Sequence, residues 1–304
     1  MEVHLVDGTW ELFRHHHAVP PHRVDDRDVA AVRGVLRSMV RLLERGATHV
    51  AVATDHVIES FRNDLWPGYK TGDGIDPVLR SQFVPLETTL AAAGIAVWPM
   101  VDQEADDGLA AGAAVAAADP RVARVLVCSP DKDLAQCVRG ARVVQFDRRG
   151  DGTVRDEAEI RARFGVGPAR VPDWLALVGD AADGYPGIPG FGARTAAQAI
   201  RHFGGIADMP ADAAAWVRAG MRTGPRLAAT LAERRDEALL FLRLATLRED
   251  APVMPGGVDG ILWRGPGDGC AAACRGVGAP EVPERLERLA EARAAAGIGG
   301  ATGG

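Results

Sequence analysis

The sequence predicts an α/β fold, a parallel sheet flanked by helices, followed by a mainly helical C-terminal half. Up to about residue 160, short apolar runs that favour strands alternate with stretches of helical apolar period, which is typical of a parallel sheet covered by helices. Beyond that point the spacing is helical, and Gly- and Pro-rich turns separate the segments. We therefore expect a sheet domain in residues 1–160, a helical domain in 161–250 and a C-terminal extension in 251–304.

The elements can be placed in order along the chain. A short buried strand and a turn are expected at 3–8, and a helix within 25–46 is expected to end at Gly46. Further strands are expected at 48–55, at the end of 84–100 after a helix and a Gly stop, in 121–133 and at 141–146. An Ala-rich helix follows residues 102–112, and two helices flank a Gly/Pro-dense hairpin within 171–205. The tail from Ala294 is expected to be disordered.

Composition and cysteine usage favour a cytoplasmic protein. The apolar runs are too short to span a bilayer, and the N-terminus lacks a basic region with a cleavage site, so we expect no membrane partner. Cys128 and Cys137 lie in apolar surroundings and are expected to be buried free thiols. Cys270 and Cys274 are four residues apart on an expected helix, a spacing that suits neither a disulfide nor a zinc site.

Nine acidic residues fall where strands end or helices begin. They are Asp7, Asp55, Glu104, Asp106, Asp107, Asp131, Asp133, Asp180 and Asp183. The carboxyl ends of parallel strands meet at one edge of a sheet, so many of these side chains should converge. Crowded carboxylates repel one another unless divalent cations bind them, and a pair of ions about 4 Å apart is suited to phosphodiester hydrolysis. Taken singly, each acid is also explained as a turn residue or as an acid in the first turn of a helix.

A second candidate site is the segment GYPGIPGFGARTAAQAI, residues 184–200. A Gly-rich hairpin between helices exposes backbone N–H groups that can hold a phosphate without reading bases, although a plain helix cap and turn gives the same pattern. The net charge of −6 argues against a nucleic-acid partner, but two divalent cations would cancel four of these charges. The basic run RTGPRLAATLAERR is either a DNA-facing stripe or a solvated helix face.

Five segments together resemble one known family. LVDGT, SFRNDLWPGYK, EADD, SPDKDLAQCV and GDAADGYPGIPGFGARTA occur in the order found in the 5′-nuclease family, which includes the N-terminal exonuclease domain of bacterial DNA polymerase I and the flap endonucleases. The resemblance spans residues 3 to about 200, and no polymerase follows, as in a stand-alone form. It implies a PIN-like parallel sheet and a C-terminal helix–hairpin–helix (H3TH-type) DNA-binding extension.

The resemblance also implies an activity and its partners. We expect a divalent-metal-dependent 5′-3′ exonuclease or structure-specific flap endonuclease that hydrolyses DNA by a two-metal-ion mechanism. The metal would be Mg²⁺, two ions per site, with Mn²⁺ as a substitute and K⁺ at the helix–hairpin–helix. The partner would be DNA with 5′ ends, flaps or nicks, bound by a monomer. Two alternatives stay open, a PIN-type ribonuclease and a non-catalytic structure-specific DNA-binding module.

Residue roles follow from the matching motifs. Asp7, Asp55, Glu104 and Asp106 match the acids of the first metal; Asp131, Asp133 and Asp180 or Asp183 match those of the second, with Asp107 nearby through water. Arg62 and Lys70 match the basic pair that steadies the scissile phosphate, a task that suits cations because charge builds on the phosphoryl oxygens. The expected DNA-binding residues are Tyr69, Gly187, Gly190, Gly192, Arg194 and Thr195.

The sequence departs from the family pattern in several places. Gly184 stands where Asn is common, and Arg194 where Lys is usual. Three histidines at 15–17 are expected at a solvated helix end, with contact to a base or phosphate as the alternative. Residues 71–90 correspond to the arch through which the 5′ strand passes in the family, but this segment carries only Arg80 against three acids. We therefore expect a weak grip on the strand, with a disordered segment that never meets DNA as the alternative.

Overall fold

The chain forms two compact units in the computed structural model, which describes residues 1–150 and 152–297. Unit 1 contains Met1–Ile58, Gly72–Ser129 and the chain from Glu249 on. Unit 2 contains Glu59–Thr71 and Pro130–Arg248. The last segment therefore returns to unit 1 and is not an extension of its own.

Unit 1 is built on parallel strands, as the alternation of strands and helices predicts. The strands are β1 (Glu2–Asp7), β4 (His49–Asp55), β5 (Ala96–Met100) and β6 (Arg124–Cys128). β1 pairs in parallel with both β4 and β6, and β4 pairs in parallel with β5. The carboxyl ends of these strands therefore lie at the same edge of the sheet, where parallel sheets bind ligands.

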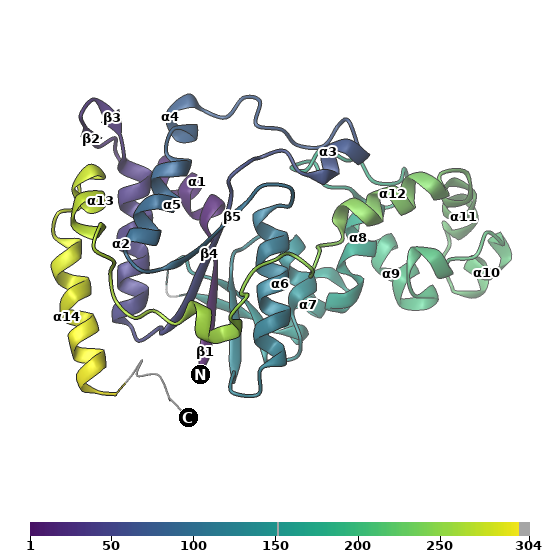
Figure 1. The fold of residues 1–304 in the computed structure, drawn as a ribbon. Helices are drawn as coiled ribbons and strands as arrows, with labels where there is room; N and C mark the ends of the chain where they lie inside the picture. Colours follow the sequence, from purple (N-terminus) through teal and green to yellow (C-terminus); the bar gives the residue numbers. More distant parts are fainter. Residues whose placement is uncertain (151, 298–304) are drawn as a thin grey trace. The chain divides into compact units, whose positions relative to one another are not determined.

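Helices cover both faces of this sheet (Figure 1). The Ala-rich α6 (Ala105–Ala118) lies on one face, and α1 (Gly8–Ala18), α2 (Ala30–Glu44) and α5 (Phe83–Ala92) lie on the other. The apolar period predicted α2, which buries Val32, Val35, Leu36 and Met39. Gly46 follows with a φ of 102°, a conformation that glycine adopts without steric cost at a helix end.

The C-terminal segment completes unit 1. The smaller elements of the unit are the antiparallel hairpin of β2 (Arg23–Val24) and β3 (Arg27–Asp28), α4 (Pro77–Arg80), the 3₁₀ helix η4 (Gly257–Ile261), α13 (Cys270–Gly276) and α14 (Val282–Ala295). The Arg293 guanidinium on α14 donates to the carbonyl oxygens of Leu43 and Ala47, at 2.7 and 2.8 Å. These bonds fasten the end of the described chain to the end of α2.

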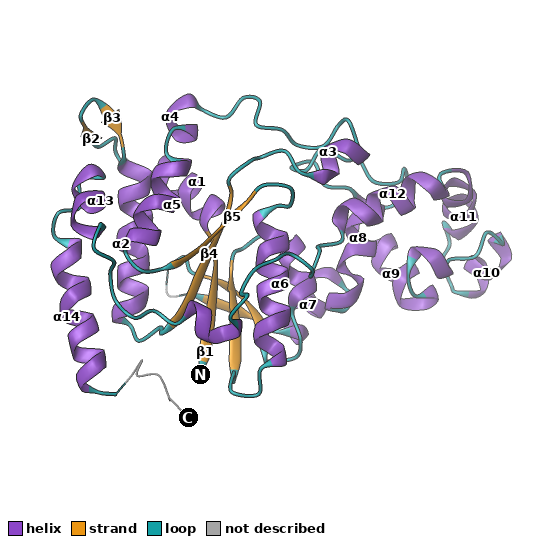
Figure 2. Ribbon diagram, viewed as in Figure 1, coloured by secondary structure: helices purple, strands orange, loops and turns teal. Residues whose placement is uncertain are grey.

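Unit 2 is mostly helical, as predicted, with one antiparallel hairpin of β7 (Val143–Asp147) and β8 (Thr153–Arg155) (Figure 2). Its helices are α3 (Phe61–Leu65), η1 (Asp133–Cys137), α7 (Glu157–Phe164), η2 (Pro168–Arg170), α8 (Val171–Val178), α9 (Ala193–Phe203), η3 (Ile206–Asp208), α10 (Ala213–Arg218), α11 (Gly224–Glu233) and α12 (Arg235–Ala245). Trp216, Tyr185 and Phe241 are the largest fully buried hydrophobic side chains of its core. The strand at 141–146 was predicted, but its short partner β8 was not.

Several local expectations are corrected. Asp7 does not lead into a turn, because it caps α1 directly. His17 is exposed at the end of this helix as expected, but His15 is buried. The tail from Ala294 starts as helix, since α14 includes Ala294 and Ala295, and residues 298–304 lie outside the described residues.

The expectation of buried free thiols at Cys128 and Cys137 is confirmed. All four cysteines are free and buried, and the Sγ atoms of Cys270 and Cys274 lie 3.7 Å apart. No helix in the described parts of the chain combines the length and apolar character needed to cross a bilayer.

Candidate active site

The acids at the ends of β1 and β4 lie at neighbouring positions of unit 1. Asp7 accepts hydrogen bonds from the Trp10 N–H at 2.8 Å and from the Ser129 hydroxyl at 2.9 Å. Asp55 accepts from the Ala105 N–H at 2.7 Å, which ties the end of β4 to the start of α6. The parallel register pairs Asp7 with Ala53, so the two acids end adjacent strands at the same edge.

The acids that open α6 have partly structural tasks. Glu104 is the N-cap residue and is buried, and its N–H donates to the Asp107 carboxylate at 3.0 Å. Asp107 is fully buried, so it matches the helix-cap interpretation of this acidic stretch. Asp106 lies between them on the first turn and is half-buried. A hydrogen bond therefore joins Asp55 to the start of α6, and Asp7 ends the adjacent strand.

Unit 2 contains a tight group of three buried acids. Ligand atoms of Asp133, Asp180 and Asp183 all lie within 4.8 Å of one another, a spacing at which they can hold one metal ion. Asp133 opens η1, and the other two acids lie on the loop after α8, where Asp180 forms a backbone bridge with Tyr185. The Asp133 N–H donates to the Asp131 carboxylate at 3.2 Å, so exposed Asp131 borders the group.

The electrostatics of this group fit a divalent cation. Burial raises the pKa of the Asp133 carboxyl well above its ordinary range, and three neighbouring carboxylates raise it further. Its Oδ1 atom is buried and has no hydrogen-bond partner. Burial and the charges of Asp133, Asp183 and Asp180 also raise the pKa of the neighbouring tyrosine, Tyr185, which stays protonated. A hard cation with oxygen ligands would neutralise the repulsion and coordinate the unpartnered oxygen.

Two lysines offset part of the charge of the acids. Lys70 Nζ lies 3.0 Å from Asp183 Oδ1, and Lys132 Nζ lies 2.7 Å from Asp180 Oδ2. Burial lowers the pKa of the Lys132 ammonium, but the hydrogen bond and charge of Asp180 outweigh it, so the pKa is raised. The structure thus brings Lys70 to the acids as expected. Lys132 was missed, although its place between Asp131 and Asp133 in the sequence is a usable signal.

Arg62 is placed differently from a phosphate-facing side chain. It is 1% exposed. Its guanidinium donates to the Leu244 carbonyl oxygen at 2.8 Å and to the Thr246 carbonyl oxygen at 3.3 Å, and it lies 4.6 Å from the centroid of the Phe61 ring. Arg62 therefore joins α3 to the end of α12, a task that its sequence neighbours do not reveal.

The predicted hairpin lies between α8 and α9 in unit 2. Gly187 has a φ of 71°, and a Cβ atom there would come within 2.4 Å of the Gly179 nitrogen. Gly190 is also in the left-handed region, with a φ of 90°. Gly192 is exposed, starts α9 and has open space around it, and its N–H donates to Thr195 Oγ1 at 2.9 Å. The hairpin is therefore packed at Gly187 and open to solvent at Gly192.

The other two predicted DNA-binding residues differ in exposure. Arg194 is exposed on the first turn of α9. Tyr69 is 4% exposed, belongs to the core of unit 2, and its ring lies 5.6 Å from the Lys70 ammonium. Tyr69 is thus placed to support Lys70 and offers little surface to a nucleic acid.

The segment corresponding to an arch contains helices, which contradicts the alternative that it is disordered. Its unit 1 part contains α4 and most of α5. Asp76 caps α4 and lies 3.4 Å from His16 Nε2. Glu87 is buried and accepts from the Thr54 hydroxyl at 2.7 Å, so it belongs to the interior of unit 1 and not to a strand-facing surface.

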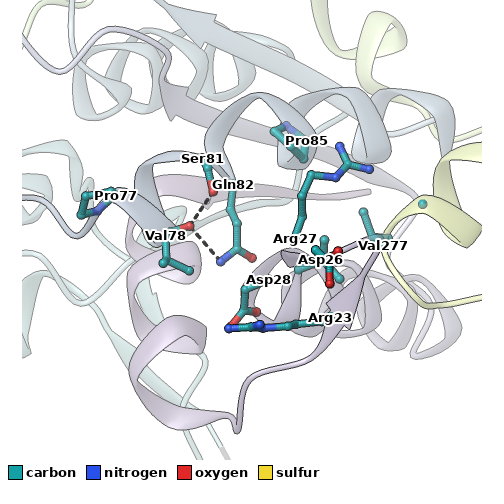
Figure 3. Close-up of a pocket in the computed structure, with 12 residues that line it drawn as sticks. Arg23, Asp26, Arg27, Asp28, Pro77, Val78, Ser81, Gln82, Pro85 and Val277 are labelled. Carbon is teal, nitrogen blue, oxygen red and sulfur yellow. Dashed lines mark hydrogen bonds between the residues drawn. The ribbon is translucent and has the colours of Figure 1, made fainter.

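A cavity of about 400 Å³ lies elsewhere in unit 1 (Figure 3). The β2–β3 hairpin, α4 and the start of α5 line it, and the side chains of Ser81 and Gln82 both donate to the Val78 carbonyl oxygen there. None of the nine predicted metal ligands lines this cavity. The candidate chemistry therefore belongs to the acids at the strand ends and not to the cavity.

Two family descriptions match most of the chain. Residues 2–165 match the 5′-3′ exonuclease N-terminal resolvase-like domain, and residues 166–262 match the 5′-3′ exonuclease C-terminal SAM fold. The chain therefore belongs to the 5′-3′ exonuclease family, a family of hydrolytic nucleases. The prediction of the family and of its fold is confirmed.

Curated relatives and solved structures agree with this assignment. The chain is 34% identical over 250 residues to DNA polymerase I of Pseudomonas aeruginosa, covering 81% of this chain and 27% of that protein. It is 35% identical over 210 residues to DNA polymerase I of Mycobacterium leprae, covering 66% of this chain and 23% of that protein. The chain thus spans about a quarter of the length of these relatives.

Among solved structures, T5 5′-exonuclease with bound zinc matches with a TM-score of 0.62 at 17% identity, covering 96% of this chain and 99% of the other. The catalytic core of Rad2 in complex with DNA substrate matches with a TM-score of 0.60 at 15% identity, covering 94% of this chain and 91% of the other. At identities this low, the similarity supports a shared fold and nothing beyond it.

Proposed function

We propose that this chain hydrolyses DNA phosphodiesters at 5′ ends, flaps or nicks, as a Mg²⁺-dependent 5′-3′ exonuclease and flap endonuclease. The proposal includes Mn²⁺ as a substitute metal, K⁺ at the α8–α9 hairpin, a monomeric state and a cytoplasmic location. The observation that carries it is the group of Asp133, Asp180 and Asp183, which crowds buried carboxylates around an unpartnered oxygen in a chain of the exonuclease family.

In this proposal the acids of each unit hold a metal ion. Asp7, Asp55, Glu104 and Asp106 belong to the first site, with Asp107 ordering the start of α6. Asp133, Asp180 and Asp183, bordered by Asp131, belong to the second. Bound divalent ions supply Lewis-acid activation of water and neutralise charge on the reacting phosphate. The chain's own task is to hold these oxygens close together before the metal arrives.

Lys70 and the hairpin have distinct roles toward DNA in this proposal. Lys70 provides a positive charge beside the second group of acids, where negative charge develops on the phosphoryl oxygens during attack. Gly190, Arg194 and Thr195 present backbone N–H groups and one cation to duplex phosphates without reading bases, and Gly192, whose own N–H is bonded to Thr195 Oγ1, leaves open space for their approach. Arg62 and Tyr69 support the site from within unit 2.

Cleavage assays with defined substrates test the proposal. The protein is incubated with 5′-flap, nicked and single-stranded DNA and with matched RNA strands, in Mg²⁺ or in chelator, and the products are sized. We expect short 5′ products or released flaps from DNA, and no cleavage in chelator. Cleavage of RNA alone would favour the ribonuclease alternative. Binding without cleavage in Mg²⁺ or Mn²⁺ would favour the non-catalytic module.

A further inference from the structure

Lysine is scarce in this chain, and both of its lysines lie beside the second group of acids. The sequence contains 35 lysines and arginines together, and only Lys70 and Lys132 are lysines. Lys70 Nζ lies 3.0 Å from Asp183 Oδ1, and Lys132 Nζ lies 2.7 Å from Asp180 Oδ2. The chain therefore uses the ammonium group, a compact charge on a flexible stem, only next to these acids, and uses arginine everywhere else.

The carboxylate of Asp180 is engaged at both oxygens. Its Oδ1 atom accepts the Ala182 N–H at 3.0 Å, which fixes the orientation of the carboxylate on the loop after α8. Its Oδ2 atom faces the Lys132 ammonium. The Asp180 side chain is only 2% exposed, so solvent does little to balance its charge. Lys132 thus supplies a nearby positive charge to a buried carboxylate that would be costly to leave uncompensated.

A divalent cation on the same carboxylate would meet this ammonium. Mg²⁺ binds carboxylate oxygens at about 2.1 Å, so an ion on Oδ2 of Asp180 would lie less than about 5 Å from the Lys132 nitrogen. Two positive charges this close repel each other in a buried site. The ammonium can withdraw, because the Lys132 side chain is 34% exposed and its stem is flexible. A planar guanidinium would hold the carboxylate through two N–H groups and would leave less readily.

We propose that Lys132 is an exchangeable counter-ion of the second acid group, which holds Asp180 before a divalent cation binds and releases this carboxylate when the ion arrives. Competition between the ion and the ammonium then sets the affinity of the site for metal. Lys70 differs, because its main-chain N–H also donates to the Asp183 carbonyl oxygen at 3.0 Å and keeps it beside the loop. The inference rests on the proposed function only for the assignment of Asp180 as a metal ligand.

Metal binding without DNA tests the exchange. Mn²⁺ is titrated into the full chain, and the EPR signal of free Mn²⁺ gives the Kd values. Lys132→Met keeps the length of the side chain but removes its charge, so we expect about tenfold to a hundredfold tighter binding at one site, the equivalent of one lost charge-assisted contact. In chelator this variant should have a lower Tm, because Asp180 loses its counter-charge. A lower Tm with an unchanged Mn²⁺ Kd would give Lys132 a structural role alone and overturn the proposal.

Two further variants separate charge from shape. Lys132→Arg keeps the charge, so it should bind Mn²⁺ no more tightly than the unaltered protein, and a gain equal to that of Lys132→Met would contradict the exchange. Lys132→Gln gives the same comparison should Lys132→Met fail to fold. Arg161→Met is the matched control, because Arg161 forms an ion pair of the same length, 2.7 Å, with Glu157 outside the acid group. It should change the Kd less than about twofold. A gain as large as that of Lys132→Met would show an effect of net charge alone and overturn the proposal.

The gain should also depend on Asp180. In an Asp180→Asn background, Lys132→Met should change Mn²⁺ binding less than about threefold, and an equal gain in both backgrounds would contradict the exchange at this carboxylate. If the unaltered protein binds Mn²⁺ but cuts no DNA, the proposed function fails while the Kd comparison still decides the exchange. If it cuts DNA and Lys132→Met binds Mn²⁺ no more tightly, the exchange fails alone.

Discussion

The acids of the two units differ in what their oxygens already bind. In unit 1, Asp7, Asp55 and Asp107 accept backbone N–H groups and so help to fix the starts of α1 and α6. In unit 2, Asp180 also accepts a backbone N–H, from Ala182 at 3.0 Å, but Asp133, Asp180 and Asp183 face one another, with lysines as counter-charges. The same sequence feature, an acid at the end of a strand or the start of a helix, thus serves two physical tasks. One is to satisfy backbone donors, and the other is to concentrate negative charge.

The largest expected effect separates these two tasks directly. Asp133→Asn keeps the shape of the side chain but removes a charge from the tight group, so we expect the cleavage rate in Mg²⁺ to fall by about a thousandfold or more, because metal binding dominates phosphodiester hydrolysis. The same change in unit 1, Asp107→Asn, keeps the hydrogen bond to the Glu104 N–H. It should cost less than about tenfold. Single-turnover rates on a 5′-flap substrate measure both. Similar losses of cleavage rate in the two variants would show that the acids of the two units do not have different tasks.

The second prediction concerns the hairpin that carries the unit 2 acids. Gly187→Ala forces a side chain into the backbone at Gly179, next to Asp180, and into a left-handed conformation, so we expect about 2–4 kcal/mol of lost stability. Gly192→Ala meets open space at a φ of −128°, and we expect a change within about 0.5 kcal/mol. Urea unfolding of both variants gives the comparison. Equal stabilities would show that the close approach at Gly187 does not hold the hairpin.

A third prediction follows from the raised pKa of Asp133. A carboxyl whose pKa is raised by folding contributes stability below its unfolded pKa, and this contribution is lost as the pH rises through the folded pKa. In chelator, Asp133→Asn should therefore raise the Tm at neutral pH by about 2–4 °C and have little effect near pH 4. Mg²⁺ should raise the Tm of the unaltered protein more than that of the variant, which keeps the acids of the first site. Thermal unfolding at several pH values checks the sign, and a lower Tm at neutral pH would contradict it.

The smallest predicted effect concerns the cap of α6. Asp107→Ala removes the acceptor of the Glu104 N–H and should cost about 1 kcal/mol, whereas Asp107→Asn should cost less than half of that. Urea midpoints of the two variants provide the measurement. If Asp107 were a metal ligand without a capping role, neither variant would change much in stability in chelator.

Much of the fold was predictable because it depends on local patterns. The apolar period gave α2, the apolar runs gave β1, β4 and β6, and glycine marked the end of α2. The strands that were missed, β2, β3 and β8, are two or three residues long, too short for a period to register. The return of the C-terminal segment to unit 1 depends on tertiary contacts such as those of Arg293, which no local pattern reveals.

The acidic residues of the candidate site could be singled out from the sequence, but the placement of its basic and aromatic residues was harder to predict. Asp133, Asp180 and Asp183 were singled out from strand ends and from a resemblance, and the structure brings them together. Arg62 and Tyr69 were expected to face DNA, but both are buried. Two partners of Arg62 are backbone carbonyl oxygens more than 180 residues away, and a carbonyl leaves no trace in the amino-acid sequence.

The order of the units along the chain has a consequence for synthesis. Every residue of unit 2 precedes Glu249, whereas unit 1 needs the residues that follow it. On the ribosome, unit 2 is therefore complete while α2 still lacks its neighbour α14 and the bonds from Arg285 and Arg293. Unit 1 therefore cannot complete its packing until α14 has emerged from the ribosome. A nascent chain stalled before residue 280 should hold a protease-resistant unit 2 and a protease-sensitive unit 1.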